Sequence, residues 1–157
     1  MFKKRSVPKK TRLLFVDEHN DLQSNIAEYF VREMYGDLYD VSSAGPKSDC
    51  VDCELISVMY QLGYDIRTYT SMDFGHEDLP KGFDYVIFLE RSTYDRVKDD
   101  IPFDAPQILH DFGRKENFDK ATDDVELYEC IKEFIEKVRV WCEETFADPE
   151  ALKTMVI

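Results

Sequence analysis

Four side chains that could do chemistry lie within five residues of one another near the start of the chain. Asp17, Glu18, His19 and Asp21 follow the apolar run LLFV and precede a stretch with helical spacing of apolar residues. A carboxylate can attack a phosphorus atom, and carboxylates with an imidazole can hold a hard cation or zinc. α/β proteins bind ligands beyond the carboxyl ends of parallel strands. The loop 17–24 is therefore the first candidate site.

The elements that must position this loop alternate between strands and helices. Apolar patterns predict strands at 11–16, 38–45, 83–90 and 105–113, and helices at 25–36, 53–63, 92–100 and 123–146. Ser24 and Ser92 are the expected N-caps of two of these helices. This order predicts an α/β three-layer sandwich, in which a four-stranded parallel sheet has helices on both faces. The runs LLFV and YVIFL are apolar on both sides, so we expect both strands to be central, in the strand order 2-1-3-4.

Length and charge limit what the chain does. A chain of 157 residues with 43% hydrophobic residues has the size of one domain. We expect a basic flexible tail at 1–10, the α/β domain at 11–147 and a C-terminal extension at 148–157. Residues 1–12 hold six Lys and Arg and no acid, so the rest carries 14 basic and 33 acidic side chains. That excess of acid disfavours nucleic acid and anionic membranes as partners. Without an apolar leader or a spanning run, the sequence predicts a cytoplasmic protein.

Several short motifs occur in the order in which a known family has them. FVDEHNDLQSNIAE (15–28) matches an apolar strand followed by C-x5-R-[ST], proline, an apolar residue and Ala-Glu. Ser-Ala-Gly (43–45), VMYQLGYDI (58–66), FDYVIFLE (83–90) and HDFG (110–113) come next. On these motifs, residues 11–146 resemble the low-molecular-weight protein tyrosine phosphatase and arsenate reductase family. The resemblance implies the fold of that family, with loop 17–24 as its phosphate-binding loop.

The residues that perform the family's chemistry are replaced. By the resemblance, the nucleophilic cysteine, the arginine that clamps the phosphoryl oxygens and the general acid fall at Asp17, Gln23 and Arg114. Glu18 and Asp21 add further acids to the loop. At an effective dielectric constant of about 20, each pair of like unit charges about 5 Å apart costs roughly 3 kcal/mol. We therefore expect no catalytic residues here and no bound oxyanion.

Other loop positions are partly retained. Asn20 and Ser24 match residue types that hold the family's loop by hydrogen bonds, whereas His19 replaces a glycine and Asn25 replaces the proline. The candidate binding site is thus a vestigial loop made of Asp17, Glu18, His19, Asn20, Asp21, Leu22, Gln23 and Ser24.

Two other interpretations of the acids stay open. Asp17 after an apolar strand also resembles the nucleophile of magnesium-dependent aspartate phosphatases of the haloacid dehalogenase class. That class has a second acid two residues later, where this chain has His19. A weak metal site made of Asp17, His19 and Asp21 is the second alternative, although a solvated acidic loop is the commoner outcome. We expect no metal and no other cofactor.

The four cysteines do not form a disulfide scaffold at this length. Cys50 and Cys53 form a C-x-x-C, which we expect to be an inert, partly buried pair of thiols. Arsenate reductases coupled to thioredoxin use a downstream cysteine pair, but residues 88–100 contain no cysteine. A zinc site with Cys130 and Cys142 is not expected, because these residues lie on different faces of one helix.

The sequence therefore predicts a catalytically inactive, phosphatase-like domain with a binding or regulatory role. An unidentified protein is the expected partner. The alternative is a phosphatase or arsenate reductase with residual or changed phosphate chemistry that depends on a metal or on Asp17.

Overall fold

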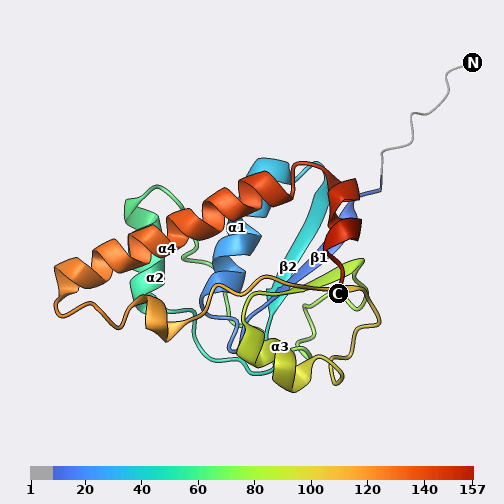
Figure 1. Ribbon diagram of the computed structural model, residues 1–157, viewed down its shortest axis with the longest axis horizontal. Coiled ribbons are helices and arrows are strands. Elements are labelled where there is room, and N and C mark those ends of the chain that lie inside the picture. The colour runs from blue at the N-terminus through green and yellow to red at the C-terminus, as the bar shows by residue number, and fades with distance from the viewer. Residues whose placement is uncertain (1–8) are drawn as a thin grey trace, which may run out of the picture.

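The structure is a computed structural model that describes residues 9–157, so the predicted tail lies almost wholly outside the described residues. Strands and helices alternate along the chain (Figure 1). In chain order they are β1 (Thr11–Val16), α1 (Gln23–Tyr35), β2 (Tyr39–Ala44), α2 (Cys53–Gln61), β3 (Tyr85–Phe88), α3 (Arg91–Val97), β4 (Gln107–Leu109) and α4 (Asp124–Thr145), with two 3-10 turns, η1 (Lys115–Asn117) and η2 (Pro149–Met155). None of the helices in the described range has the length and apolar composition that crossing a membrane requires.

The sheet confirms the predicted topology. Its four strands are all parallel and lie in the order β2-β1-β3-β4, so β1 and β3 are the two central strands. The carboxyl ends of β1 and β3 therefore lie next to each other, with Val16 paired to Phe88. Loop 17–24 leaves the sheet at this point and leads directly into α1.

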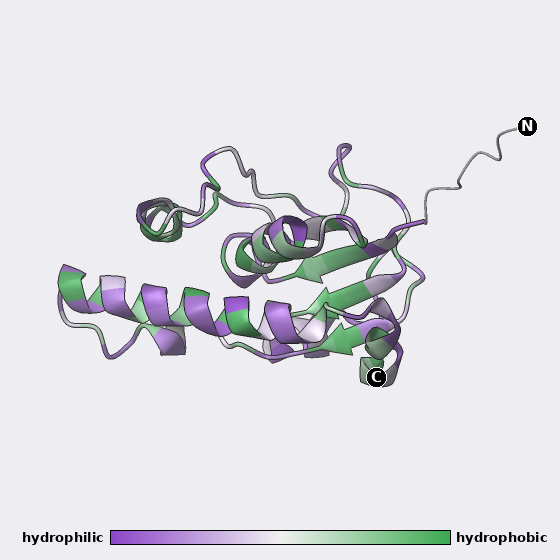
Figure 2. Ribbon diagram, turned by 90° about the horizontal axis from the view of Figure 1, so that it is seen from above, coloured by the Kyte–Doolittle hydropathy of each residue, from purple (hydrophilic) through white to green (hydrophobic). Residues whose placement is uncertain are grey.

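Two apolar clusters cover the two faces of the sheet, as strands without polar alternation require. Leu13 and Phe15 of β1 face the larger cluster, which is covered by α1, α2 and α4. Leu14 and Val16 face the smaller cluster, where α3 and the segments around Leu79 and Phe103 pack. Coloured by hydropathy, the strands are largely hydrophobic, as burial on both faces of the sheet requires (Figure 2). The carboxyl-terminal halves of the central strands (13–16 and 86–88) are buried, so loop 17–24 starts from a well-packed base.

Several predicted boundaries are wrong in detail. Helix α1 begins at Gln23, one residue before Ser24, so Ser24 lies inside the first turn and is not the N-cap. Helix α3 begins at Arg91, so Ser92 is not an N-cap either. The fourth strand ends at Leu109. Beyond it, the N–H groups of His110 and Phe112 donate to the carbonyls of Phe88 and Leu89 (2.9 Å each), but residues 110–113 are not a strand.

The predicted partial burial of Cys50 and Cys53 is wrong, because both are exposed to solvent. All four cysteines are free, and Cys130 and Cys142 of α4 are buried. Cys53 is the first residue of α2 and is exposed, whereas Leu55, Val58 and Met59 are the buried residues of this helix.

Candidate functional site

The side chain of Asp17 turns into its own loop and accepts hydrogen bonds from it. Its Oδ1 accepts the backbone N–H of Asp21 (3.2 Å), and its Oδ2 accepts those of Leu22 (3.2 Å) and Ser24 (2.8 Å). The hydroxyl of Ser24 donates to the same Oδ2 at 2.8 Å. Free N–H groups at a helix N-terminus form a ready anion site. Here the fully buried carboxylate of Asp17 is the anion that occupies it.

A second set of contacts, which we call the floor, fixes the shape of the loop. It consists of Asn20, Ser24 and Ser43, all buried. The Asn20 amide donates to the hydroxyls of Ser24 (2.9 Å) and Ser43 (2.8 Å), and its oxygen accepts the N–H of Met72 (2.8 Å). Asn20 has a φ of 49°, the left-handed region that Asn tolerates better than most residues. The resemblance places a glycine of the family at His19, but the residue whose backbone is in the left-handed region is Asn20.

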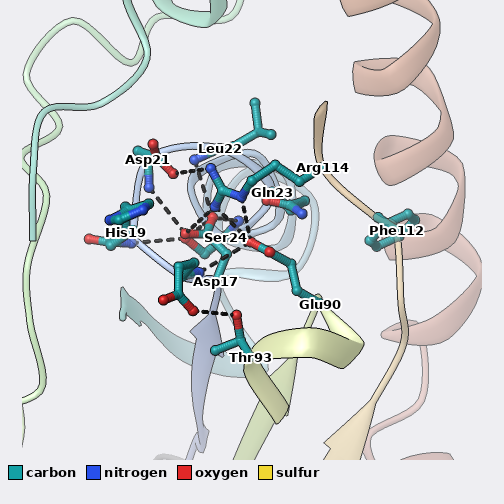
Figure 3. Close-up of polar contacts among 12 residues, drawn as sticks. Asp17, His19, Asp21, Leu22, Gln23, Ser24, Glu90, Thr93, Phe112 and Arg114 are labelled. Atoms are coloured by element: carbon teal, nitrogen blue, oxygen red, sulfur yellow. Dashed lines mark hydrogen bonds and ion pairs between the residues drawn. The ribbon is translucent and has the colours of Figure 1, made fainter. Parts of the chain in front are cut away.

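Arg114, which directly follows the HDFG segment, reaches the loop and contacts its acids (Figure 3). Its guanidinium pairs with Glu90 (2.6 Å), Asp21 (2.8 Å) and Asp17 (3.3 Å). We call these four residues the mouth. Burial alone would lower the pKa of Arg114, but the hydrogen bond with Glu90 and the charges of Asp17, Glu90 and Asp21 raise it. The side chain at the position of the family's general acid is therefore a fixed cation that does not release a proton.

One guanidinium does not neutralise three carboxylates. The mouth has a formal charge of −2, and burial together with the charge of Asp17 raises the pKa of Asp21 despite its contact with Arg114. A cavity of about 360 Å³ beside the mouth is lined by Asp111 and Glu116 as well as by Glu90 and Arg114. The entrance to the loop is therefore acidic.

Glu18 does not face the loop interior. In the sequence it counts among the acids expected to repel an anion in the loop, but its side chain contacts α3 instead. Its carboxylate accepts the hydroxyl of Thr93 at 2.8 Å and pairs with Arg96, both on α3. Burial acts to raise the pKa of Glu18, but the hydrogen bonds from Arg96 and Thr93 lower it. The backbone N–H of Glu18 also donates to Glu90 at 3.1 Å, which ties the loop to the end of β3. The acids that matter at the mouth are thus Asp17, Asp21 and Glu90.

Gln23 and the HDFG segment complete the site. Gln23 is buried, and its amide donates to the carbonyl of Gly113, which has a left-handed φ of 70°. Asp111 accepts the N–H groups of Arg91 (3.1 Å) and Gly113 (3.0 Å), and this holds the turn that directs Arg114 into the mouth. The position of the family's clamp is therefore filled by a neutral amide that serves to anchor this segment.

The weak metal site predicted at Asp17, His19 and Asp21 has no support in the geometry. Both carboxylates are committed to Arg114. Within residues 9–157, no three or more His, Cys, Asp and Glu side chains are grouped so that they could hold a metal ion.

Sequence reasoning placed Asp17, Asp21, Gln23 and Arg114 at the site, and the structure brings these four together. It missed Glu90, which contacts both Glu18 and Arg114. A signal was present, because Glu90 ends the strongest predicted strand, next to the strand that feeds the loop. No local signal pointed to Thr93 or Arg96, whose contacts with Glu18 depend on the position of α3.

Comparison with known proteins agrees with this geometry. The family model described as low molecular weight phosphotyrosine protein phosphatase matches residues 12–144. The chain belongs to this family. No curated protein matches it.

Solved structures of this family share the fold. A low-molecular-weight protein tyrosine phosphatase from T. tengcongensis is 24% identical, with a TM-score of 0.60, and the match covers 86% of this chain and 97% of that one. An arsenate reductase in its phosphate-binding state is 23% identical, with a TM-score of 0.56 and coverage of 85% and 95%. The tyrosine phosphatase amsI of Erwinia amylovora is 12% identical, with a TM-score of 0.61 and coverage of 94% and 99%. At these identities the likeness establishes the fold alone.

Proposed function

We propose that this family member is catalytically inactive and serves as a binding or regulatory domain. The observation that carries the proposal is the position of Asp17. Its carboxylate takes up the loop N–H groups of Asp21, Leu22 and Ser24, which would otherwise be free to hold a phosphoryl group. A protein whose anion site is filled by its own side chain has no room there for substrate.

The charge of the mouth supports the same proposal. Each unit charge of a phosphate dianion about 5 Å from one uncompensated carboxylate costs roughly 3 kcal/mol at an effective dielectric constant of about 20. Two uncompensated charges at the mouth therefore disfavour the binding of a dianion by more free energy than ordinary phosphate contacts contribute.

The contacts also argue against Asp17 as a nucleophile in its own right. Its Oδ1 accepts the N–H of Asp21 and pairs with Arg114, and its Oδ2 accepts two N–H groups and the Ser24 hydroxyl. A nucleophile needs an accessible lone pair, and this carboxylate is fully buried. We therefore disfavour the alternative of a changed phosphatase that uses Asp17.

A direct assay tests the proposal. We expect the purified protein to hydrolyse para-nitrophenyl phosphate and to reduce arsenate no faster than a buffer blank, and vanadate to give no heat of binding by calorimetry. The matched control is Asp17→Asn, which removes the charge but keeps the shape. Turnover in the wild type that survives repurification and is lost in Asp17→Asn would overturn the proposal.

A stepwise rescue series sharpens this test. The double variant Asp17→Cys with Gln23→Arg restores the thiol and the clamp, yet we expect its rate to stay at background. The new arginine would lie beside Arg114, and Asp21 and Glu90 would still repel the substrate. Adding Arg114→Asp and Asp21→Gly should give the first measurable rate. Family-like turnover in the double variant would show that the mouth does not block catalysis.

A further inference from the structure

The C-x-x-C segment has two exposed thiols beside the candidate site. Cys50 and Cys53 are free and open to solvent, whereas the other two cysteines are buried and unavailable. Two thiols three residues apart can be joined by one disulfide bond if the backbone between them turns. The residues between Cys50 and Cys53 therefore decide whether this pair is a redox site.

Those residues are tied to loop 17–24. Val51 is buried, and the Asp52 side chain caps α2 by accepting the N–H of Leu55 at 3.0 Å. The backbone N–H of Asp52 donates to the carbonyl of Asp21 at 3.0 Å. Asp21 in turn pairs with Arg114 at the mouth. Asp52 is thus hydrogen-bonded to the backbone of a residue whose side chain belongs to the mouth.

The backbone holds the two thiols in an open arrangement. Asp52 is extended, with φ of −56° and ψ of 123°, and residues 50–52 form neither a turn nor a bend. A disulfide needs Cα atoms within roughly 4.4–6.8 Å of each other. Residues three apart reach that distance only in a turn or helix. Closing the bond therefore requires Asp52 to leave its extended conformation, and with it both the cap of α2 and the contact with Asp21.

We propose that Cys50 and Cys53 form a reversible redox site, oxidised by low-molecular-weight disulfides, whose closure releases Asp52 from loop 17–24. The thiolate of one cysteine attacks the disulfide, which breaks its S–S bond and releases one small thiol. The second cysteine then attacks the mixed disulfide and releases the second small thiol. Two electrons and two protons pass from the cysteine pair to the small disulfide, and one protein S–S bond forms.

The first test follows the chemistry on the full chain. Oxidised mercaptoethanol is a suitable probe because it is neutral, so the acids around the cysteines do not repel it. We expect the folded protein to lose the mass of two hydrogen atoms, with the new bond mapped to the peptide that contains Cys50 and Cys53. Cys50→Ser and Cys53→Ser should each gain one mercaptoethanol instead. A wild type that keeps mercaptoethanol on both cysteines, or that does not react while folded, would refute the proposal.

The second test addresses the coupling to Asp52. Asp52→Ala removes the cap that opposes closure, so we expect it to raise the equilibrium ratio of disulfide to dithiol about fivefold. Asp52→Asn keeps a capping side chain and should leave the ratio unchanged. Asp49→Ala removes an equal charge next to Cys50 without touching the cap, and should leave it unchanged too. If Asp52→Ala and Asp49→Ala have the same ratio of disulfide to dithiol, the native conformation of residues 50–53 does not oppose formation of the Cys50–Cys53 disulfide, and the proposal is wrong on this point.

The third measurement reports on the loop. In amide NMR spectra we expect oxidation to shift the signals of Asp52, Asp21 and Leu22 in the wild type, and none of these in the Cys50→Ser/Cys53→Ser double variant. Shifts confined to residues 50–53 in the wild type would separate the redox site from the loop and overturn the coupling.

Discussion

The floor and the mouth of loop 17–24 lie within a few residues of each other, yet they have different chemistry. The floor, formed by Asn20, Ser24 and Ser43, is neutral and holds the backbone by hydrogen bonds between small polar groups. The mouth is a cluster of three carboxylates around Arg114. The floor keeps residue types that the resemblance assigns to the family's loop, whereas the mouth holds Asp17 and Arg114 at positions that the resemblance aligns with the nucleophile and the general acid. The shape of the loop and the charge at its mouth therefore depend on different side chains.

The two regions meet at Ser24. Its hydroxyl accepts from Asn20 in the floor and donates to Asp17 at the mouth. The carboxylate of Asp17 accepts the N–H groups of Leu22 and Ser24 at the start of α1, so part of the helix end is satisfied from outside the helix rather than by an N-cap side chain at Ser24. The buried carboxylate and the retained hydroxyl stabilise the same helix end.

The mouth should show the largest effect on stability when its cation is removed. Arg114→Met keeps much of the side-chain volume but removes the cation that Asp17, Glu90 and Asp21 share. Breaking a buried ion pair from one side costs roughly 3–5 kcal/mol. We expect a loss of that order in the free energy of unfolding, measured by urea denaturation. The control is Arg96→Met, because Arg96 pairs with Glu18 at the surface, where such pairs contribute about 1 kcal/mol or less. Equal losses in the two variants would mean that the mouth is not an electrostatic cluster.

The floor should show a smaller effect with a different cause. Asn20→Ala removes three hydrogen bonds and leaves a β-carbon at a positive φ, so we expect a loss of roughly 2–4 kcal/mol in the free energy of unfolding. Asn20→Gly loses the same bonds but accepts the backbone, and should be more stable than Asn20→Ala by about 1 kcal/mol. Urea denaturation of both variants measures the difference. Identical values would show that the left-handed backbone at Asn20 adds nothing to the role of the floor.

The smallest effect should come from His110, which follows β4 and leads toward the mouth. Burial lowers the pKa of His110, whose ring stacks on Trp141. A lowered pKa means that the folded state binds the proton less well than the unfolded state. The contribution of His110 to stability is therefore complete above about pH 6.5 and is lost as the pH falls below that value toward the folded-state pKa. His110→Phe keeps an aromatic ring on Trp141 and should flatten this part of the pH profile, as measured by thermal unfolding from pH 7.5 to about 5. Parallel profiles for the two proteins would contradict the lowered pKa.

The scaffold could be predicted because its signals are local. LLFV and YVIFL are continuous apolar runs, and such strands must be covered on both faces, which placed β1 and β3 at the centre of the sheet. The helix ends were less predictable. Ser24 looked like an N-cap by residue type, but the group that meets the free N–H groups is Asp17, seven residues earlier.

The sequence by itself determined the strand order, the location of the loop and the residue types Asp17, Gln23 and Arg114 at the positions that the resemblance aligns with the family's cysteine, arginine and acid. These follow from residue identity and from apolar spacing, which depend on neighbours along the chain. Only the tertiary structure decided that Asp17 points inward, that Glu18 turns away to Arg96, and that Arg114 joins acids from two segments. Asp21 and Arg114 are 93 residues apart in sequence, and Glu90 reaches Arg114 only because β3 lies beside β1. Charge pairs of this kind depend on which chain segments pack together, and no local pattern encodes that.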